Sequence, residues 1–155
     1  EKEEDLQKLS NDIFMYYGLG CRSVSKIYLP KDYDLDILFK QVYSWKDIIN
    51  NSSYYNNYTY NKTIYLMSEE KFFDNGFLIL KESTEIGSPI GAVFFEYYEN
   101  DNTVIKSLKK YSEKIQCIVG KNIVENSIEF GNTQRPSLDD FADKINTLDF
   151  LLKLS

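Results

Sequence analysis

The chain has 155 residues, of which 43% are hydrophobic and 15% aromatic, and its formal net charge is −6. This length and apolar content suit one compact domain with a hydrophobic core and exclude a disordered tail. The negative charge argues against nucleic acid as a partner, because phosphate binding requires clustered Lys and Arg. No apolar run approaches the roughly 20 residues of a membrane span, so we expect a soluble, cytoplasmic protein.

The first third of the chain predicts a helix, a strand and a second helix. Apolar residues at helical spacing indicate a helix over 5–17, which Gly18 ends. The segment KIYLP at 26–30 predicts a short strand. Asp34 then caps an amphipathic helix that ends before Asn50.

The middle of the chain predicts a polar loop followed by a helix and two strands. Residues 50–61 are rich in Asn, Ser and Tyr, which favours a packed or partner-facing loop, and a helix follows over about 61–72. The near-continuous apolar run FLILK at 77–81 is typical of a strand buried on both faces. The run IGAVFFEYY at 90–98 predicts another strand.

The last third completes a parallel arrangement. Asn102 or Thr103 caps a helix, and the apolar run IQCIV at 115–119 predicts the next strand. Strand, helix and strand in this order form a βαβ unit, so we predict an α/β protein in which at least part of the sheet is parallel. A final amphipathic helix is expected over 138–152, capped by Ser137.

The residue types that could carry chemistry are few. The chain has no histidine, so Ser-His and Cys-His catalytic pairs are excluded. Its two cysteines, Cys21 and Cys117, are far apart in the sequence, and we therefore predict no metal site. Cys117 lies within an apolar run, where a buried free thiol is expected.

Cys21 lies in a different setting, directly behind two glycines. Backbone N–H groups at a turn, with Arg22 adjacent, would stabilise a thiolate. Gly18 and Gly20 leave room for a substrate carbonyl, and the Cys21 N–H could donate to its developing oxyanion. On chemistry alone, a purely structural turn is the alternative.

The spacing around this cysteine resembles a known signature. Gly18, Cys21 and Lys26, followed by IYL, resemble the active-site signature of the aldehyde dehydrogenase superfamily, with a Gly three residues before a catalytic Cys and a basic residue leading a strand. The resemblance implies that Cys21 is the nucleophile and that Gly18, Gly20 and Arg22 form its oxyanion turn. Arg22 as a solvated surface charge is the alternative.

Two later segments are also similar to that superfamily. Glu85-Ile86-Gly87-Ser88-Pro89-Ile90 resembles its Glu-x-Phe-Gly-Pro segment, with Gly for Phe and Ser for Gly, which implies that Glu85, or Glu82 nearby, binds the nicotinamide-side ribose. Ile128-Glu129-Phe130-Gly131 resembles the Pro-Phe-Gly loop beside the substrate tunnel. The alternatives are an ordinary loop carboxylate for Glu85 and a core anchor with a turn for Phe130 and Gly131.

The chain as a whole resembles the acyl-CoA reductase (LuxC) family of this superfamily, in the segments YYGLGCRSVSKIYLP, NNYTYNKTIYLM, DNGFLILKES, SPIGAVFFEYY and FGNTQRPSLDDFADKINTLDFL. The resemblance implies that residues 1–155 are the C-terminal catalytic domain, with an aldehyde dehydrogenase-like α/β fold of three α/β/α layers and a mostly parallel sheet. It places the nucleotide-binding domain, which would hold most of the NADPH or NADH, outside this chain. The implied reaction forms an acyl-cysteine from long-chain acyl-CoA, or from an acylated carrier protein, and releases a fatty aldehyde. A homodimer is compatible with the resemblance.

Two other functions stay open at this point. The tyrosine-rich residues 54–60 suit a non-enzymatic protein-interaction module, and an oxidative aldehyde dehydrogenase would use the same thiol. A nucleophilic Cys21 predicts rapid alkylation near neutral pH, whereas an interaction module predicts an ordinary thiol.

Overall fold

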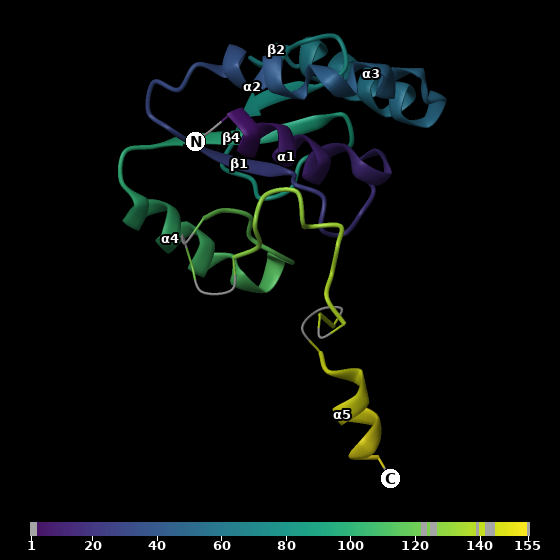
Figure 1. The fold of residues 1–155 in the computed structure, drawn as a ribbon. Helices are drawn as coiled ribbons and strands as arrows, with labels where there is room; N and C mark the ends of the chain where they lie inside the picture. Colours follow the sequence, from purple (N-terminus) through teal and green to yellow (C-terminus); the bar gives the residue numbers. More distant parts are fainter. Residues whose placement is uncertain (1–2, 122–123, 125–126, 139, 142–144, 155) are drawn as a thin grey trace.

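The structure, a computed structural model, describes residues 3–121, 124, 127–138, 140–141 and 145–154 (Figure 1). The chain contains both helices and strands, with one strand after the first helix and three consecutive strands between α3 and α4. In order, the elements are α1 (Glu3–Phe14), η1 (Met15–Gly18), β1 (Lys26–Pro30), α2 (Leu35–Val42), η2 (Tyr43–Asn50), α3 (Ser52–Met67), β2 (Phe73–Asp74), β3 (Ile79–Glu82), β4 (Ala92–Tyr98), α4 (Asp101–Lys110), η3 (Ser112–Lys114) and α5 (Thr147–Leu152), where η denotes a 3₁₀ helix.

The four strands form one open sheet in the order β1-β4-β3-β2. Strand β4 pairs in parallel with both of its neighbours, with Lys26 opposite Phe94 and Ile79 opposite Ala92. The short strand β2 pairs with β3 in the antiparallel direction. The predicted α/β class with a mostly parallel sheet is therefore confirmed, as are the strands expected at 26–30, 77–81 and 90–98 within two residues at their ends.

Helices lie on both sides of the sheet. Helices α1 and α2 pack against each other on one side, and α4 lies on the other (Figure 1). The Tyr28 hydroxyl and Ser107 Oγ, 2.9 Å apart, join β1 to α4. The next side chain of β1, Leu29, is buried in the core on the α1 side. The largest fully buried apolar side chains of this core are Phe14, Leu38, Val42, Leu78, Ile79, Leu80, Val93 and Phe95.

The first helix is shorter than the sequence predicts. Tyr16 and Tyr17 have φ angles of 54° and 60°, which are left-handed values that bulky residues rarely adopt. Helix α1 consequently ends at Phe14, and Gly18 at φ 71° completes the change of direction. Asp34 caps α2 as predicted, because its side chain accepts a hydrogen bond from the Asp36 N–H.

The loop predicted over 50–61 is wrong, because most of this segment lies in α3. Asn51 caps the helix by accepting from the Tyr54 N–H at 3.0 Å, and the side chains of Tyr54, Tyr58 and Tyr65 are buried on one face. The turn preference of this composition is overridden by the burial of these three rings. The helix predicted over 61–72 is the second half of α3, which ends at Met67.

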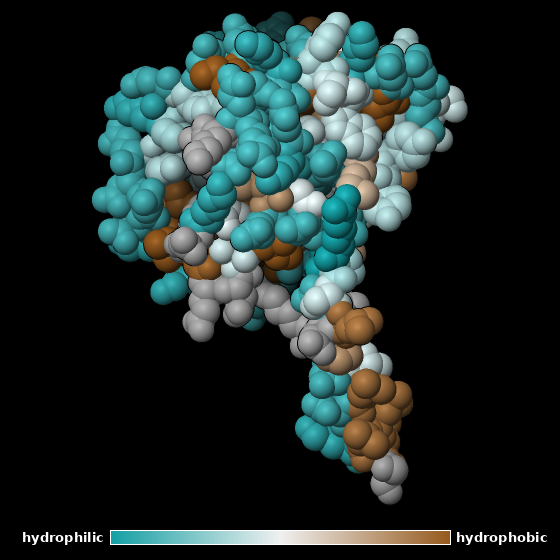
Figure 2. All heavy atoms as spheres, in the orientation of Figure 1, coloured by the Kyte–Doolittle hydropathy of each residue, from teal (hydrophilic) through white to brown (hydrophobic). Residues whose placement is uncertain are grey.

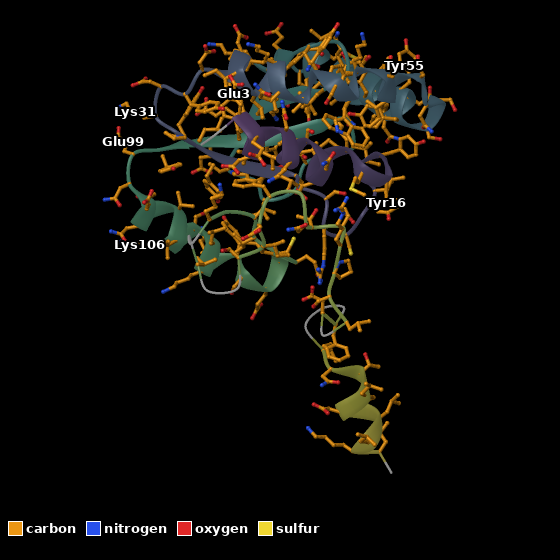
Figure 3. All side chains as sticks on the ribbon, viewed as in Figure 1. Glu3, Tyr16, Lys31, Tyr55, Glu99 and Lys106 are labelled. Carbon is orange, nitrogen blue, oxygen red and sulfur yellow. The ribbon has the colours of Figure 1, made fainter. Side chains whose placement is uncertain are left out.

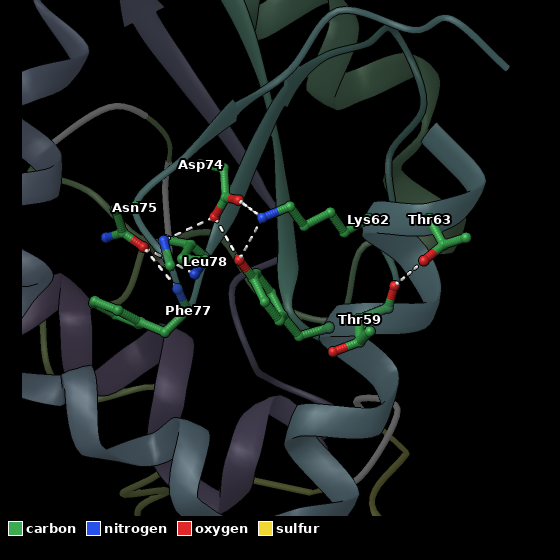
Figure 4. A network of polar contacts seen from close by, with 9 residues as sticks. Thr59, Lys62, Thr63, Asp74, Asn75, Phe77 and Leu78 are labelled. Atoms are coloured by element: carbon green, nitrogen blue, oxygen red, sulfur yellow. Dashed lines mark hydrogen bonds and ion pairs between the residues drawn. The ribbon is translucent and has the colours of Figure 1, made fainter. Parts of the chain in front are cut away.

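A polar network ties α3 to the sheet at Asp74 (Figure 4). The Tyr58 hydroxyl donates to Asp74 Oδ1 at 2.7 Å, and the Lys62 ammonium lies 2.5 Å from Oδ2. The Gly76 N–H also donates to Oδ1, at 2.8 Å. Close by, the backbone of Gly91 touches α3, since a Cβ at Gly91 would lie 2.8 Å from the Tyr58 Cα.

The strand predicted at 115–119 is also wrong, and with it the βαβ unit over 90–119. In the described part of this region, an isolated bridge between Val119 and Ile128 takes the place of a strand. The parallel pairs of the sheet come from β1, β3 and β4 instead. The preceding helix α4 is capped by Asn100, not by Asn102 or Thr103, because the Asn100 side chain accepts from the Asn102 N–H.

The C-terminal helix is shorter than the predicted span 138–152, of which residues 139 and 142–144 lie outside the described residues. Helix α5 covers Thr147–Leu152 and stands away from the sheet (Figure 1). Apolar side chains gather on its surface in Figure 2, where Leu148 is 64% exposed and Phe150 57%. Within the described part of the chain, no helix has the length and apolar character needed to cross a membrane.

Candidate functional site

Cys21 occupies the centre of a β-turn between α1 and β1. The Ser23 N–H donates to the Gly20 carbonyl at 2.9 Å, which closes the turn and leaves Cys21 and Arg22 as its two central residues. The Cys21 side chain is exposed. Within the described residues, the backbone N–H groups of Cys21 and Arg22 donate to no acceptor. An exposed thiol thus has free backbone donors beside it, which is what an oxyanion site needs.

The same segment forms the wall between two clefts. Cys21, Ser23, Val24 and Ser25 line both of them. The first cleft, of about 230 Å³, lies between β1 and the residues around α4, and it is mainly apolar: its lining includes Leu9, Ile27, Ile86, Val104, Leu108, Ile115, Ile118, Val119 and Phe130. The second cleft, of about 210 Å³, is lined by Gly18, Gly20, Tyr54 and residues 88–93, among others. A group on Cys21 can therefore be approached from two directions.

Arg22 is not a free cation. Its guanidinium lies 3.4 Å from Asp140 Oδ2, and its side chain is only 14% exposed. A hydrogen bond from the Ser137 backbone N–H, and then one from Arg22, lower the pKa of Asp140 below its usual value. The sequence predicts Ser137 as the cap of the last helix, but that helix, α5, is capped by Asn146, and the Ser137 backbone N–H donates to Asp140 Oδ2 instead.

Lys26 lines the first cleft, but its charge is engaged. The Nζ atom donates to the Ser83 carbonyl at 2.5 Å and to Glu96 Oε2 at 2.7 Å. The Lys26 side chain is 6% exposed. Lys26 thereby fixes β1 to β4 and to the start of the 83–91 loop, and its ammonium is held by these partners.

The two candidate ribose ligands lie in and beside that loop. Glu82 ends β3 and Glu85 lies in the loop, and both are exposed and line neither cleft. Their neighbour Ile86 lines the first cleft, and its carbonyl accepts from Ser25 Oγ at 3.4 Å. The loop is thus next to the Cys21 segment through Ile86, while Glu82 and Glu85 contribute to neither cleft.

Of the two candidate tunnel residues, one lines the first cleft and the other supports it through a backbone hydrogen bond. Phe130 lines the first cleft. Gly131 has φ 86°, and its N–H donates to Asp12 Oδ2 at 2.7 Å. A side chain at Gly131 would lie 3.1 Å from the Lys8 Cβ. Gly131 therefore holds Phe130 in place by its backbone.

Three further residues at this site are not predicted from the sequence. Cys117 is half-buried in the wall of the first cleft, with Sγ 3.9 Å from the Arg22 carbonyl oxygen, and it forms no disulfide with Cys21. Asp12 is buried and binds the Phe130 loop, and Gln134 lies against Gly20. The sequence separates Asp12 and Gln134 from their partners by more than a hundred residues, so no local pattern reveals them.

No group of three or more Cys, Asp or Glu side chains within the described ranges is arranged to hold a metal ion. A comparison with protein-family models finds none that matches the chain, and no curated protein matches it either.

Proposed function

We propose that this chain is the catalytic domain of an NAD(P)H-dependent acyl-CoA reductase, with an aldehyde dehydrogenase-like fold, in which Cys21 accepts the acyl group. The observation that carries the proposal is the position of Cys21. Its exposed thiol lies at the centre of a β-turn with free backbone N–H groups, where two clefts meet. The resemblance of the sequence to the acyl-CoA reductase family supports the same role.

The residues of the chain account for the acyl-transfer step. The Cys21 thiolate attacks the carbonyl carbon of a long-chain acyl thioester, and the backbone N–H groups of Cys21 and Arg22 stabilise the oxyanion. A bond forms between the carbonyl carbon and Cys21 Sγ. The bond to the leaving sulfur breaks, and that thiolate takes a proton from solvent. The apolar first cleft, with Phe130 in its wall, suits the hydrocarbon chain next to the carbonyl.

The described residues do not by themselves fit a whole nicotinamide dinucleotide. The second cleft, about 210 Å³, is below the roughly 300–1,000 Å³ of sites for drug-sized ligands. Glu82 and Glu85 line neither cleft. NADPH, or NADH, would supply a hydride that converts the acyl-cysteine to an aldehyde. In this proposal a separate nucleotide-binding domain holds most of the cofactor, with Glu82 or Glu85 at most beside its ribose.

The rival functions share some of these features. The buried tyrosines of α3 serve the core, so the tyrosine-rich segment gives less support to an interaction module. Tyr55 and Tyr60 of the same helix are exposed and would be the residues available to such a partner. An oxidative aldehyde dehydrogenase would use the same thiol, with an aldehyde in place of the thioester.

The test is acylation of the protein by long-chain acyl-CoA, followed by intact-mass measurement and peptide mapping. We expect one acyl adduct on Cys21, formed slowly, because loss of one oxyanion donor from a partner domain costs roughly 10²–10³ in rate. Cys21→Ser should abolish the adduct. Cys117→Ser, the matched control in the same cleft, should retain it. An unmodified wild-type chain, or an adduct that persists in Cys21→Ser, would overturn the proposal.

We also propose a homodimer, with α5 in the interface. Helix α5 exposes apolar side chains, of which Leu148 is 64% and Leu151 56% exposed. Light scattering should give a dimer for the natural chain and a monomer for the double variant Leu148→Asp, Leu151→Asp. A monomeric natural chain would contradict this part of the proposal.

A further inference from the structure

The carboxamide of Gln134 contacts both ends of the β-turn that carries Cys21. A Cβ built on Gly20 would lie 2.7 Å from Gln134 Nε2 and 2.8 Å from Oε1, so the carboxamide packs directly on the Gly20 backbone. At the other end of the turn, Nε2 donates to Ser23 Oγ at 3.3 Å. Gly20 and Ser23 are also the two residues joined by the hydrogen bond that closes the turn. Gln134 therefore bridges the base of the turn.

The backbone of Gln134 is itself firmly held. It lies in a second β-turn, which the Arg135 N–H closes by donating to the Asn132 carbonyl at 3.0 Å. Thr133, the residue before Gln134, is fully buried and donates to Asp12 from both its N–H and its hydroxyl. The carbonyl of Asp12 in turn accepts from the Val24 N–H, directly after the first turn. Asp12 thus fixes the two turns against each other.

A side chain at residue 20 would displace the Gln134 carboxamide from the turn. Gly18 has a left-handed φ of 71°, which glycine adopts readily, whereas Gly20 is not among the glycines with positive φ. Alanine could therefore adopt the backbone of Gly20. The space that a side chain would need there is filled by the Gln134 carboxamide.

We propose that Gln134 is the positioning residue of the Cys21 turn, which it holds from both ends so that the Cys21 thiol and its free N–H groups keep their relative geometry. This inference rests on the proposed role of Cys21. Acyl transfer depends on this geometry, because small displacements of reacting groups reduce rates strongly. The loop that supplies Phe130 to the first cleft thereby also stabilises the nucleophile.

A double-mutant cycle tests the proposal. The variants are Gly20→Ala, Gln134→Ala and the two together, and the measurement is the rate of Cys21 modification by acyl-CoA and by iodoacetamide, quantified by peptide mapping. Each single substitution should slow modification roughly 2- to 10-fold, the loss expected for one hydrogen bond and its packing. The double variant should be no slower than Gln134→Ala, because the added methyl group then meets no carboxamide. Ser23→Ala, which removes the hydrogen-bond acceptor, tests the same contact if Gly20→Ala does not fold.

Gly87→Ala is the matched control. A Cβ at Gly87 would meet no atom within 4 Å, and its φ is not left-handed, so modification should proceed at the wild-type rate. Gln134→Glu adds a like charge near the thiolate without shortening the side chain. It should move the pH profile of Cys21 alkylation to higher pH while the urea midpoint changes little. That shift tests only whether residue 134 lies near the thiol. A residue that only stabilised the fold would lower the urea midpoint in Gln134→Ala and leave the Cys21 modification rate of the folded protein unchanged.

The outcomes separate this inference from the proposed function. Wild-type rates in Gln134→Ala and Ser23→Ala, or a Gly20→Ala substitution that slows modification by the same further factor in the Gln134→Ala background as in the wild-type background, would overturn the role of Gln134 even if Cys21 is acylated. If acyl-CoA leaves no adduct on the wild-type chain but the iodoacetamide cycle shows the coupling, the proposed function fails. The positioning of Cys21 by Gln134 then stands.

Discussion

Thr133 and Asp12 are joined by two hydrogen bonds across 121 residues of sequence. The Thr133 N–H donates to Asp12 Oδ1 at 3.1 Å, and its hydroxyl donates to the same oxygen at 2.9 Å. Oδ2 accepts from the Gly131 N–H at 2.7 Å. Since Asp12 and Thr133 are both buried, water cannot replace these partners. The pair joins the first helix to the loop that borders the apolar cleft.

Removal of the Asp12 carboxylate should strongly destabilise the protein. Asp12→Ala leaves two N–H groups and one hydroxyl without their acceptor, and we expect a loss of about 3 kcal/mol in the free energy of unfolding. Thr133→Val removes only the hydroxyl bond and should cost about 1 kcal/mol. Urea unfolding measures both. Asp36→Ala, at an exposed position of α2, is the control and should stay within about 0.5 kcal/mol of the natural chain.

The ion pair of Lys26 and Glu96 should contribute much more than an exposed pair on the same two strands. Lys26→Met leaves Glu96 and the Ser83 carbonyl without their donor, and we expect a loss of about 2 kcal/mol in unfolding free energy. Lys31 and Glu99 form the matched exposed pair, with side chains 62% and 72% exposed, at the far end of these strands (Figure 3). Lys31→Met should cost less than about 0.5 kcal/mol. Equal losses of unfolding free energy in Lys26→Met and Lys31→Met would contradict the expectation that the buried ion pair contributes more than the exposed one.

Alanine substitutions at Gly76 and Gly91 should distinguish the cost of backbone strain from the cost of steric overlap, because the two glycines have similar φ angles. Gly91 at φ 82° and Gly76 at φ 95° are both left-handed, but only a Cβ at Gly91 would collide, with the backbone of Tyr58. Gly76→Ala should therefore lose about 1 kcal/mol from strain alone. Gly91→Ala should lose about 3 kcal/mol, because helix α3 must also shift. Thermal and urea unfolding compare the two, and a Gly76→Ala loss as large as that of Gly91→Ala would be against this account.

The Asp74 network should make stability depend on acidic pH. Burial by itself would raise the pKa of Asp74, but hydrogen bonds from Lys62, Tyr58 and the Gly76 N–H outweigh it and lower the pKa below 3.8. A carboxyl group whose pKa is lower in the folded protein than in the unfolded protein stabilises the folded protein at pH values above the unfolded-state pKa. This stabilisation is lost as the pH falls through the folded-state pKa. Burial, together with the hydrogen bond to Asp74, also raises the pKa of Tyr58.

Asp74→Asn should therefore be less stable than the natural chain near neutral pH, with a gap that narrows as pH falls below about 4. Urea midpoints of both proteins between about pH 6 and pH 3 measure the gap. Parallel curves over this range would show that Asp74 has the same pKa in the folded and unfolded states.

Elements that depend on local signals follow from the sequence. The Asp34 cap and the apolar stripe of α2 are contained within one short segment, and the apolar runs of β3 and β4 are specific enough to place both strands. The first half of helix α3 is missed because Asn and Ser favour turns locally, whereas its stability comes from tyrosine rings buried in the core. The apolar run at 115–119 could equally line a cleft, as it does here, since periodicity cannot distinguish the two.

In the candidate site, too, features set by neighbouring residues can be predicted from the sequence, and features set by long-range contacts cannot. The turn around Cys21 can be predicted because its glycines are adjacent to it in the sequence. The supports of that turn cannot, because Asp12 and Gln134 reach it through contacts that only the folded chain creates. The exposure of Glu82 and Glu85 depends likewise on how the 83–91 loop is folded, which no spacing rule specifies.

Tyr16 and Tyr17 have left-handed backbones, a conformation that costs stability in residues with a bulky side chain. The Tyr16 side chain is 62% exposed and the Tyr17 side chain 46%, so packing offsets only part of the steric penalty of about 1 kcal/mol or more that each conformation carries. Selection for thermodynamic stability alone would favour glycine or asparagine at these two positions. The aromatic pair directly ahead of the cysteine turn therefore holds a backbone conformation that costs the folded chain stability.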